Sequence, residues 1–187
     1  MSRPHCGNRA VFLDRDGTLI EDRDYLSRPE EVRLFAGVGE ALSGLIEADY
    51  KLFMVTNQSG IGRGFFTWAD LERVHNHLLG SLARKGVRFE KVYVAPEMPG
   101  AASRWRKPSP QSLRDAAEEF GLNLRESYMI GDKWIDLQCG WQAGVRKSLL
   151  VRTGYGRQTE EAHGNEMQDA VVVDDLPAAA AWILRQA

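Results

Sequence analysis

The sequence alternates between short apolar runs and helical patterns, and this alternation restricts the fold more than any other feature. Six runs have the composition of buried strands: AVFLDR, KLFMVTN, KVYVAP, SYMIGD, SLLVRT and AVVVDDL. Most of the segments between them carry apolar residues at helical spacing. Strands that alternate with helices form βαβ units. The sequence therefore predicts an α/β fold with a mainly parallel sheet.

Five segments have the pattern of helices, namely residues 38–48, 68–85, 109–120, 134–143 and 177–186. Thr67 is the expected N-cap of the second helix, and Gly121 and Gly144 are expected to end the third and fourth. The polar segment 157–169 matches no element and is expected to be a mobile loop, without a role that we can assign. Residues 1–9 are expected to form a loose leader.

Length and charge narrow the class of protein. A chain of 187 residues with 43% hydrophobic content is enough for a single domain spanning residues 1–187. The net charge of −2 gives no broad basic field, so we expect a small-molecule partner and no nucleic acid. The sequence lacks a run of about 20 apolar residues, which argues against a membrane span. Cys6 and Cys139 fit free thiols in the cytoplasm. A monomer or weak homodimer is expected.

Polar side chains follow the strands at the points where the strands end. They are Asp14 and Asp16 after the first strand, Thr56 and Asn57 after the second, and Asp132 and Asp136 after SYMIG, with Lys107 before the third helix. In an open parallel sheet, ligands bind beyond the carboxyl ends of the strands. We therefore expect these residues to form the site.

Three of these carboxylates have a spacing that suits phosphoryl transfer. Asp14, Asp16 and Asp132 would concentrate negative charge, which a hard cation such as Mg²⁺ relieves. A carboxylate beside a metal can attack phosphorus and form an aspartyl phosphate. Asp14 is then the nucleophile. Asp16 is the acid that protonates the leaving alcohol and later the base that takes a proton from water.

The remaining polar residues have supporting roles in this hypothesis. Thr56 and Asn57 would hydrogen-bond the phosphoryl group, and Lys107 would neutralise the charge that builds on its oxygens. Asp136 is expected to orient Lys107 or Lys133 rather than to contact the metal. A calcium loop is the alternative for DRDG, but Tyr25 occupies the position where that loop needs glutamate.

Four motifs occur in order: FLDRDGTL, MVTNQSG, RKPSP and MIGDKWID. Together they resemble the motifs of the haloacid dehalogenase-like (HAD-like) phosphatase superfamily. The resemblance implies a Rossmann-like three-layer α/β/α sandwich and a Mg²⁺-dependent aspartyl-phosphate mechanism. It also implies metal ligation by the Asp14 side chain, the Asp16 main-chain carbonyl and Asp132. Transport ATPases of the superfamily carry threonine where this chain has Asp16, which favours a phosphatase.

A narrower resemblance rests on LDRDGTL, TNQSGIGRG and RKP taken together. They are similar to the histidinol-phosphate and heptose-bisphosphate phosphatase group, in which the heptose 1,7-bisphosphate 7-phosphatases of surface-polysaccharide pathways have a similar early loop. The substrate contacts that this resemblance implies, in addition to Asn57, are Asp22, Arg23, Asp24, Tyr25, Gln58, Ser59, Arg106 and Lys133. Histidinol phosphate is the alternative substrate, with Glu97 or Trp105 facing its imidazole. A polynucleotide 3′-phosphatase and a non-catalytic binding subunit are further hypotheses.

The chain departs from this group in one loop. Many members hold a structural zinc before RKP, whereas Ala95, Glu97, Ser103 and Trp105 stand at the corresponding positions here. Thiolate ligands are missing from these positions, so we expect no structural zinc. We expect Trp105, Pro99 and Pro108 to hold the loop by packing. The intervals 17–34 and 87–106 are too short for a cap domain.

Overall fold

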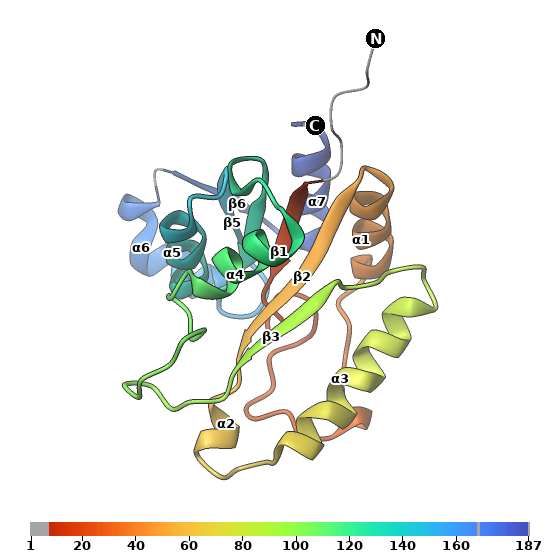
Figure 1. Ribbon diagram of the computed structural model, residues 1–187, viewed down its shortest axis with the longest axis vertical. Coiled ribbons are helices and arrows are strands. Elements are labelled where there is room, and N and C mark those ends of the chain that lie inside the picture. Colours follow the sequence, from red (N-terminus) through yellow and green to blue (C-terminus); the bar gives the residue numbers. More distant parts are fainter. Residues whose placement is uncertain (1–7, 168, 187) are drawn as a thin grey trace.

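The computed structural model describes residues 8–167 and 169–186 and has a parallel sheet at its centre (Figure 1). Its strands are β1 (Arg9–Leu13), β2 (Tyr50–Asn57), β3 (Lys91–Ala95), β4 (Tyr128–Gly131), β5 (Lys147–Val151) and β6 (Ala170–Val173). They lie in the order β3-β2-β1-β4-β5-β6, and every neighbouring pair is parallel. The chain moves outward from β1 to β3 and then returns to β4 on the other side of β1. Loops that follow β1 and β4 therefore separate at this switch point and leave room for a ligand.

Helices cover both faces of the sheet, as Figure 1 shows. The helices on one face are α1 (Val38–Glu47), α3 (Trp68–Ala83) and α7 (Leu176–Leu184), and those on the other are α4 (Gln111–Phe120) and α5 (Trp134–Ala143). Shorter elements are α2 (Ser59–Gly62), α6 (Gly156–His163) and the 3₁₀ turns η1 (Pro29–Glu31), η2 (Leu124–Glu126) and η3 (Gly164–Glu166). The expected three-layer α/β/α sandwich is confirmed. None of the helices in the described ranges is both long and apolar enough to cross a membrane.

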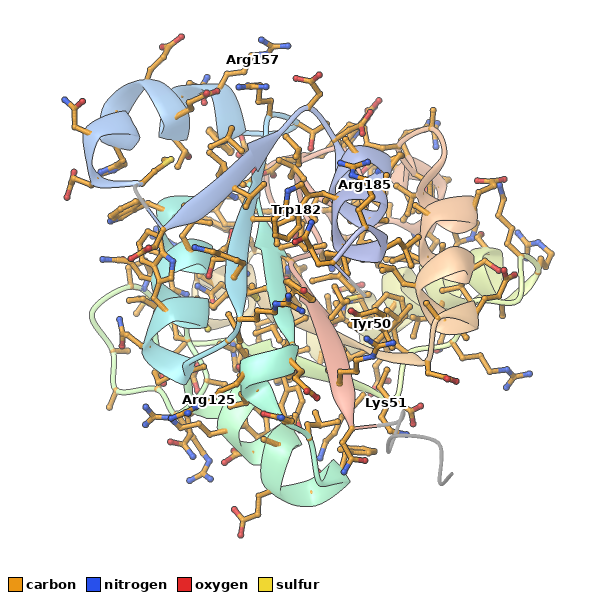
Figure 2. All side chains as sticks on the ribbon, turned by 90° about the horizontal axis from the view of Figure 1, so that it is seen from above. Tyr50, Lys51, Arg125, Arg157, Trp182 and Arg185 are labelled. Carbon is orange, nitrogen blue, oxygen red and sulfur yellow. The ribbon has the colours of Figure 1, made fainter. Side chains whose placement is uncertain are left out.

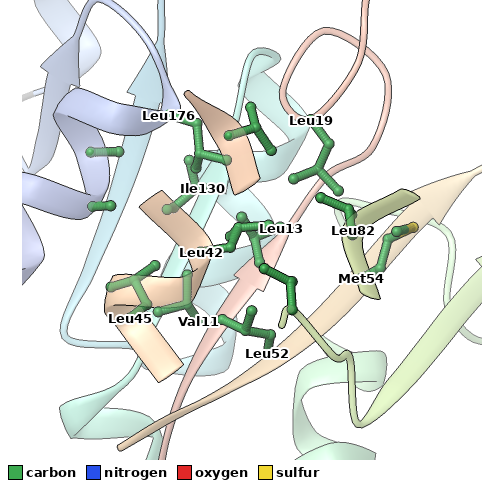
Figure 3. Packing of buried hydrophobic residues seen from close by; sticks show 14 of the residues in the cluster. Val11, Leu13, Leu19, Leu42, Leu45, Leu52, Met54, Leu82, Ile130 and Leu176 are labelled. Carbon is green, nitrogen blue, oxygen red and sulfur yellow. The ribbon is translucent and has the colours of Figure 1, made fainter. Parts of the chain in front are cut away.

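The larger core lies between the sheet and the layer formed by α1, α3 and α7 (Figure 3). Val11 and Leu13 of β1 and Ile130 of β4 point from the sheet toward Leu42 and Leu45 of α1. Each of these side chains is fully buried. At about 25 cal/mol per Å² of buried apolar surface, such contacts are the main contribution to the stability of the domain. They fix β1 and β4, which directly precede Asp14 and Asp132.

The helix ends follow the expected signals. Thr67 accepts a hydrogen bond from the Asp70 backbone N–H, and the Asp70 side chain accepts one from the Thr67 backbone, which completes a capping box. Gly121 and Gly144 end α4 and α5 with φ angles of 63° and 83°. Glycine adopts this left-handed region at a lower cost than any other residue.

The amino-terminal end of the sheet is closed by aromatic side chains. Tyr50 and Trp182 lie at this end in Figure 2, and the Tyr128 ring packs between them with centroid distances of 6.0 and 6.1 Å. Arg9 belongs to this end, with its guanidinium 4.4 Å from the Tyr50 ring centre and a 2.9 Å hydrogen bond to the Ala48 carbonyl. The expected leader is therefore too long, because β1 already begins at Arg9. Residues 1–7, including Cys6, lie outside the described residues.

The expectation of a mobile loop over residues 157–169 is wrong for most of that segment. Residues 156–163 form α6, and η3 follows directly. Arg152 donates hydrogen bonds of 2.7 and 2.8 Å to the Glu160 carboxylate, and the His163 ring stacks on Trp134 at 4.3 Å. The helix is thus held by partners outside it, although its own residues are mostly polar.

Candidate active site

Three carboxylates meet at the switch point between β1 and β4. Asp14, Asp132 and Asp136 are buried, and one oxygen of each lies within 4.8 Å of the others. The loop after β1 passes so close to Asp132 that a side chain at Gly17 would place its Cβ 2.1 Å from Asp132 Oδ2. Gly17 also has a φ of 81°. The glycine of DRDG is therefore required for the close approach of the two loops.

Lys107 neutralises part of this charge. Its Nζ donates a hydrogen bond of 2.6 Å to Asp14 Oδ1 and one of 2.9 Å to the Val55 carbonyl, and it forms a 2.7 Å ion pair with Asp136. Burial alone would lower the pKa of Lys107, but the Asp136 and Asp14 carboxylates raise it above its ordinary value. Lys107 is thus fully protonated at neutral pH. Asp136 orients Lys107, as expected, and also accepts a hydrogen bond from the Lys133 backbone at 3.0 Å.

Asp132 has the environment of a metal ligand. Its Oδ2 accepts a 2.8 Å hydrogen bond from the Tyr155 backbone, whereas its Oδ1 is buried and has no hydrogen-bond partner within residues 8–167 and 169–186. Burial, followed by the charges of Asp14 and Asp136, raises the pKa of Asp132 to about 8. An oxygen-preferring divalent cation would satisfy the free oxygen and remove the repulsion. The donor set therefore fits Mg²⁺.

Asp16 is held apart from the three converging carboxylates. Gln58 Nε2 donates hydrogen bonds of 2.9 Å to Asp16 Oδ2 and 2.7 Å to Thr56 Oγ1. Arg15 donates from Nε and Nη2 to both oxygens of Asp16. Gln58, which we expected to contact substrate, thus orients the expected acid and base. Arg15 was not predicted as a site residue; a lone arginine between two aspartates at the end of a buried strand is the signal that could have found it.

Asn57, like Gln58, holds another site residue in place. Its Nδ2 donates to the Lys107 carbonyl at 3.2 Å, and its Oδ1 accepts from the Lys107 backbone N–H at 3.0 Å. The side chain therefore fixes the backbone that carries the lysine. Thr56 lies one residue earlier on β2 and is fully buried, with its hydroxyl hydrogen free to donate beyond the Gln58 contact.

A cavity of about 270 Å³ lies beside Asp16 and Gln58, whereas Asp14, Thr56, Lys107 and Asp132 are not among the residues that line it. The expected site residues that line it are Asp16, Asp22, Arg23, Asp24, Tyr25, Asn57, Gln58, Ser59 and Lys133. Tyr155 also lines it and was not predicted as a site residue. Arg106 does not line this cavity; its Nη1 donates a 2.9 Å hydrogen bond to the Glu97 carbonyl.

The early loop, residues 21–26, closes one side of the cavity. Asp22 accepts a 2.9 Å hydrogen bond from Lys133 Nζ, which also lies 4.7 Å from the centre of the Tyr155 ring. Burial would lower the pKa of Lys133, but Asp132, Asp14 and Asp22 raise it above its ordinary value. The Tyr25 ring meets Phe65 edge to face at 4.5 Å. A cation and an aromatic edge thus border the cavity on the loop side.

The loop 96–108 is held by hydrogen bonds. Ser103 Oγ donates to Glu97 Oε2 at 2.6 Å and accepts from the Arg106 backbone at 3.1 Å. The Trp105 ring packs on Tyr93 with a centroid distance of 5.2 Å, as its expected packing role requires. The same expectation for Pro99 and Pro108 is wrong, because both are exposed.

Asp115 of α4 anchors this loop and gives a testable prediction. It accepts hydrogen bonds from Trp105 Nε1 at 2.8 Å and from two nitrogens of Arg104, and the Arg104 bond is the largest of the effects that lower its pKa to about 2. We expect Asp115→Ala to lower the free energy of unfolding by about 1–2 kcal/mol at pH 7. Because the pKa is lowered on folding, this difference should persist above about pH 4 and shrink as the pH falls toward about 2.

Urea titrations of the two proteins at several pH values measure this effect. Glu118→Ala, at an exposed position of the same helix, is the matched control and should change little. A difference between wild type and Asp115→Ala that grew on acidification would contradict the assignment.

Comparisons with known proteins agree with this geometry. Residues 104–179 match the HAD-hydrolase-like family model. The D-glycero-beta-D-manno-heptose-1,7-bisphosphate 7-phosphatase of Helicobacter pylori strain J99 is 39% identical over 77% of this chain and 83% of its own. The enzyme of the same name from Bordetella bronchiseptica is 34% identical over 96% and 99%.

Two solved structures support the same family and fold. The crystal structure of the D,D-heptose 1,7-bisphosphate phosphatase from B. bronchiseptica, complexed with magnesium and phosphate, superposes with a TM-score of 0.89 at 34% identity, over 96% of this chain and 99% of that one. The corresponding enzyme from Burkholderia thailandensis has a TM-score of 0.72 at 32% identity, over 94% and 98%. The expected superfamily and fold are confirmed. The chain belongs to the D-glycero-D-manno-heptose-1,7-bisphosphate 7-phosphatase family of HAD-like phosphatases.

Proposed function

We propose that this protein is a Mg²⁺-dependent phosphomonoesterase that hydrolyses the 7-phosphate of D-glycero-D-manno-heptose 1,7-bisphosphate. The observation that carries the proposal is the Asp14 carboxylate, which is buried, bonded to Lys107 at 2.6 Å and placed beside Asp132. The family members named above support the substrate.

Asp14, Asp132 and the main-chain carbonyl of Asp16 would hold the metal. When bound, Mg²⁺ offsets the negative charge of the phosphoryl oxygens and of the carboxylates around them. The unpartnered Oδ1 of Asp132 supports this assignment.

The protein's own residues carry the two displacements. Asp14 forms a bond to phosphorus while the bond from phosphorus to the sugar oxygen breaks, and Asp16 gives its proton to that oxygen. Asp16 then takes a proton from water as the water oxygen attacks phosphorus, which releases phosphate and restores Asp14. Lys107 stabilises the charge on the transferred group throughout.

The cavity walls support a substrate with a second anionic group and several hydroxyls. Arg23 and Lys133 supply cations, and Asp24 and Ser59 supply acceptors for hydroxyl groups. The alternative of histidinol phosphate relied on Glu97 or Trp105, but Glu97 is bonded to Ser103 and Trp105 packs on Tyr93. A heptose bisphosphate is therefore the better match.

The partner in this proposal is a small phosphorylated sugar, and the net charge of −2 argues against nucleic acid. We place the reaction in the cytoplasm, where sugar phosphates occur and where the buried thiol of Cys139 stays reduced. A monomer or weak homodimer remains our prediction.

Phosphate release tests the proposal. The panel holds both anomers of heptose 1,7-bisphosphate, histidinol phosphate, other sugar phosphates and a 3′-phosphorylated oligonucleotide, each with Mg²⁺ and each with a chelator. We expect one heptose bisphosphate to give kcat/KM at least about tenfold above every other compound, a preference worth about 1.4 kcal/mol. The chelator should stop the reaction. A flat profile, or a preference for histidinol phosphate, would contradict the proposed substrate, and full activity without divalent metal would contradict the metal site.

A further inference from the structure

Arg15 is the centre of a buried hydrogen-bond network beside the catalytic carboxylates. Its side chain is 1% exposed, and its Nε and Nη2 lie 2.8 to 3.1 Å from the two oxygens of Asp16. Nη2 also donates to Gln58 Oε1 at 3.1 Å. Such a bidentate pair fixes the plane of a carboxylate as well as its position.

The far side of this guanidinium is held by a residue from another part of the fold. His75 lies on α3, and its Nε2 is 3.1 Å from Arg15 Nη1. A guanidinium can only donate hydrogen bonds, so Nε2 must accept, and the imidazole is neutral with its proton on Nδ1. Burial, followed by the charge of Arg15, lowers the pKa of His75 to about 3, so this acceptor persists across the working pH range.

Resting on the proposed phosphatase activity, we propose that His75 is a positioning residue: it fixes Arg15, and Arg15 in turn fixes the position and plane of the Asp16 carboxyl that exchanges a proton with the leaving oxygen. Without Nε2, a buried N–H of Arg15 would lose its acceptor, which is costly enough to make the guanidinium turn toward another one. Asp16 would turn with it, because both of its oxygens are bonded to the same group. The proton donor would then be misplaced, while Asp14 and Lys107 would keep their geometry.

The choice of substrate separates this role from a merely structural one. A sugar alkoxide is a poor leaving group and needs the proton from Asp16, whereas p-nitrophenolate leaves without one. The parameter kcat/KM covers the steps up to departure of the leaving group. A misplaced Asp16 therefore lowers kcat/KM for a sugar phosphate far more than kcat/KM for p-nitrophenyl phosphate.

The experiment compares three variants with wild type on both substrates. His75→Leu removes the acceptor, His75→Gln keeps an acceptor at the position of Nε2, and His77→Ala changes an exposed histidine on the same helix. We expect His75→Leu to lower kcat/KM about tenfold or more for the sugar phosphate and less than about threefold for p-nitrophenyl phosphate. His75→Gln should recover most of the loss, and His77→Ala should match wild type.

A double-mutant cycle asks whether the effect passes through Arg15. In an Arg15→Met background, His75→Leu should cause little further loss, because the group that it positions is already missing. Should His75→Leu fail to fold, His75→Asn takes its place, since the shorter amide does not reach Arg15. Equal losses on the two substrates, or no recovery in His75→Gln, would overturn the proposal. Failure of the wild-type protein to release phosphate from either substrate would instead refute the proposed function.

Discussion

Replacement of Asp14 by asparagine is expected to reduce phosphate release by about 10⁴-fold or more. The amide cannot attack phosphorus. Among the described residues, the other carboxylate that pairs with Lys107 is Asp136, which belongs to α5 and has the role of orienting the lysine. The aspartyl phosphate therefore cannot form. Rates with the preferred sugar phosphate, measured at saturating Mg²⁺, provide the check.

The fold of this variant should survive, because Lys107 keeps its ion pair with Asp136 and its hydrogen bond to the Val55 carbonyl. The matched control is Asp49→Asn, an exposed aspartate at the other end of the sheet with a φ of 63°, a conformation that asparagine tolerates. This control should retain wild-type activity. A substantial residual rate in Asp14→Asn would show that another group attacks phosphorus.

Replacement of Asp132 by asparagine is expected to abolish turnover and yet stabilise the metal-free protein. The introduced amide can still accept the hydrogen bond from the Tyr155 backbone, while the repulsion with Asp14 and Asp136 is removed. In metal-free wild type, the pKa of Asp132 is raised on folding to about 8. That carboxyl binds its proton more tightly in the folded state, so stability should fall as the pH rises from about 4 to about 8.

Thermal unfolding with and without Mg²⁺ measures both effects. Mg²⁺ at a hundredfold excess over its Kd stabilises wild type by about 2.7 kcal/mol, and this increment should vanish in Asp132→Asn. The metal-free variant should unfold at a higher temperature than metal-free wild type, with the difference widening toward about pH 8. Asp49→Asn should behave as wild type in both respects. A variant that still gained stability from Mg²⁺ would place the metal elsewhere.

Periodicity was sufficient to predict the layers of this fold. The six strands and the five longer helices are apolar at regular intervals, and Thr67, Gly121 and Gly144 mark helix ends by local chemistry. Helix α6 was missed because it has few apolar residues and is held by Arg152 and Trp134, which lie outside the helix. Such stabilisation cannot be read from the segment itself.

In the candidate site too, the features that depend on local sequence were predictable and those that depend on distant contacts were not. The carboxylates that meet at the switch point were predictable because each follows a strand. The supporting role of Asp136 was predictable, whereas those of Gln58 and His75 were not, since Gln58 and His75 are 42 and 60 positions away from the side chains that they bond. A sequence motif gives the type of each group but does not tell whether it faces the substrate or a neighbour. Gln58 and Asn57 illustrate this, since both line the cavity and both also bond to neighbouring site residues.

The contacts of α6 determine how far this enzyme can be shortened. The Tyr155 backbone holds Asp132 Oδ2, and Thr159 Oγ1 donates a 2.9 Å hydrogen bond to the Asp132 carbonyl. A chain cut after β5 would keep all four signature motifs but would leave Asp132, the proposed metal ligand, without these two hydrogen bonds. The smallest catalytic unit therefore extends at least through Thr159, and fusion partners or permuted termini are better placed beyond α7 than within the stretch that links β5 to β6.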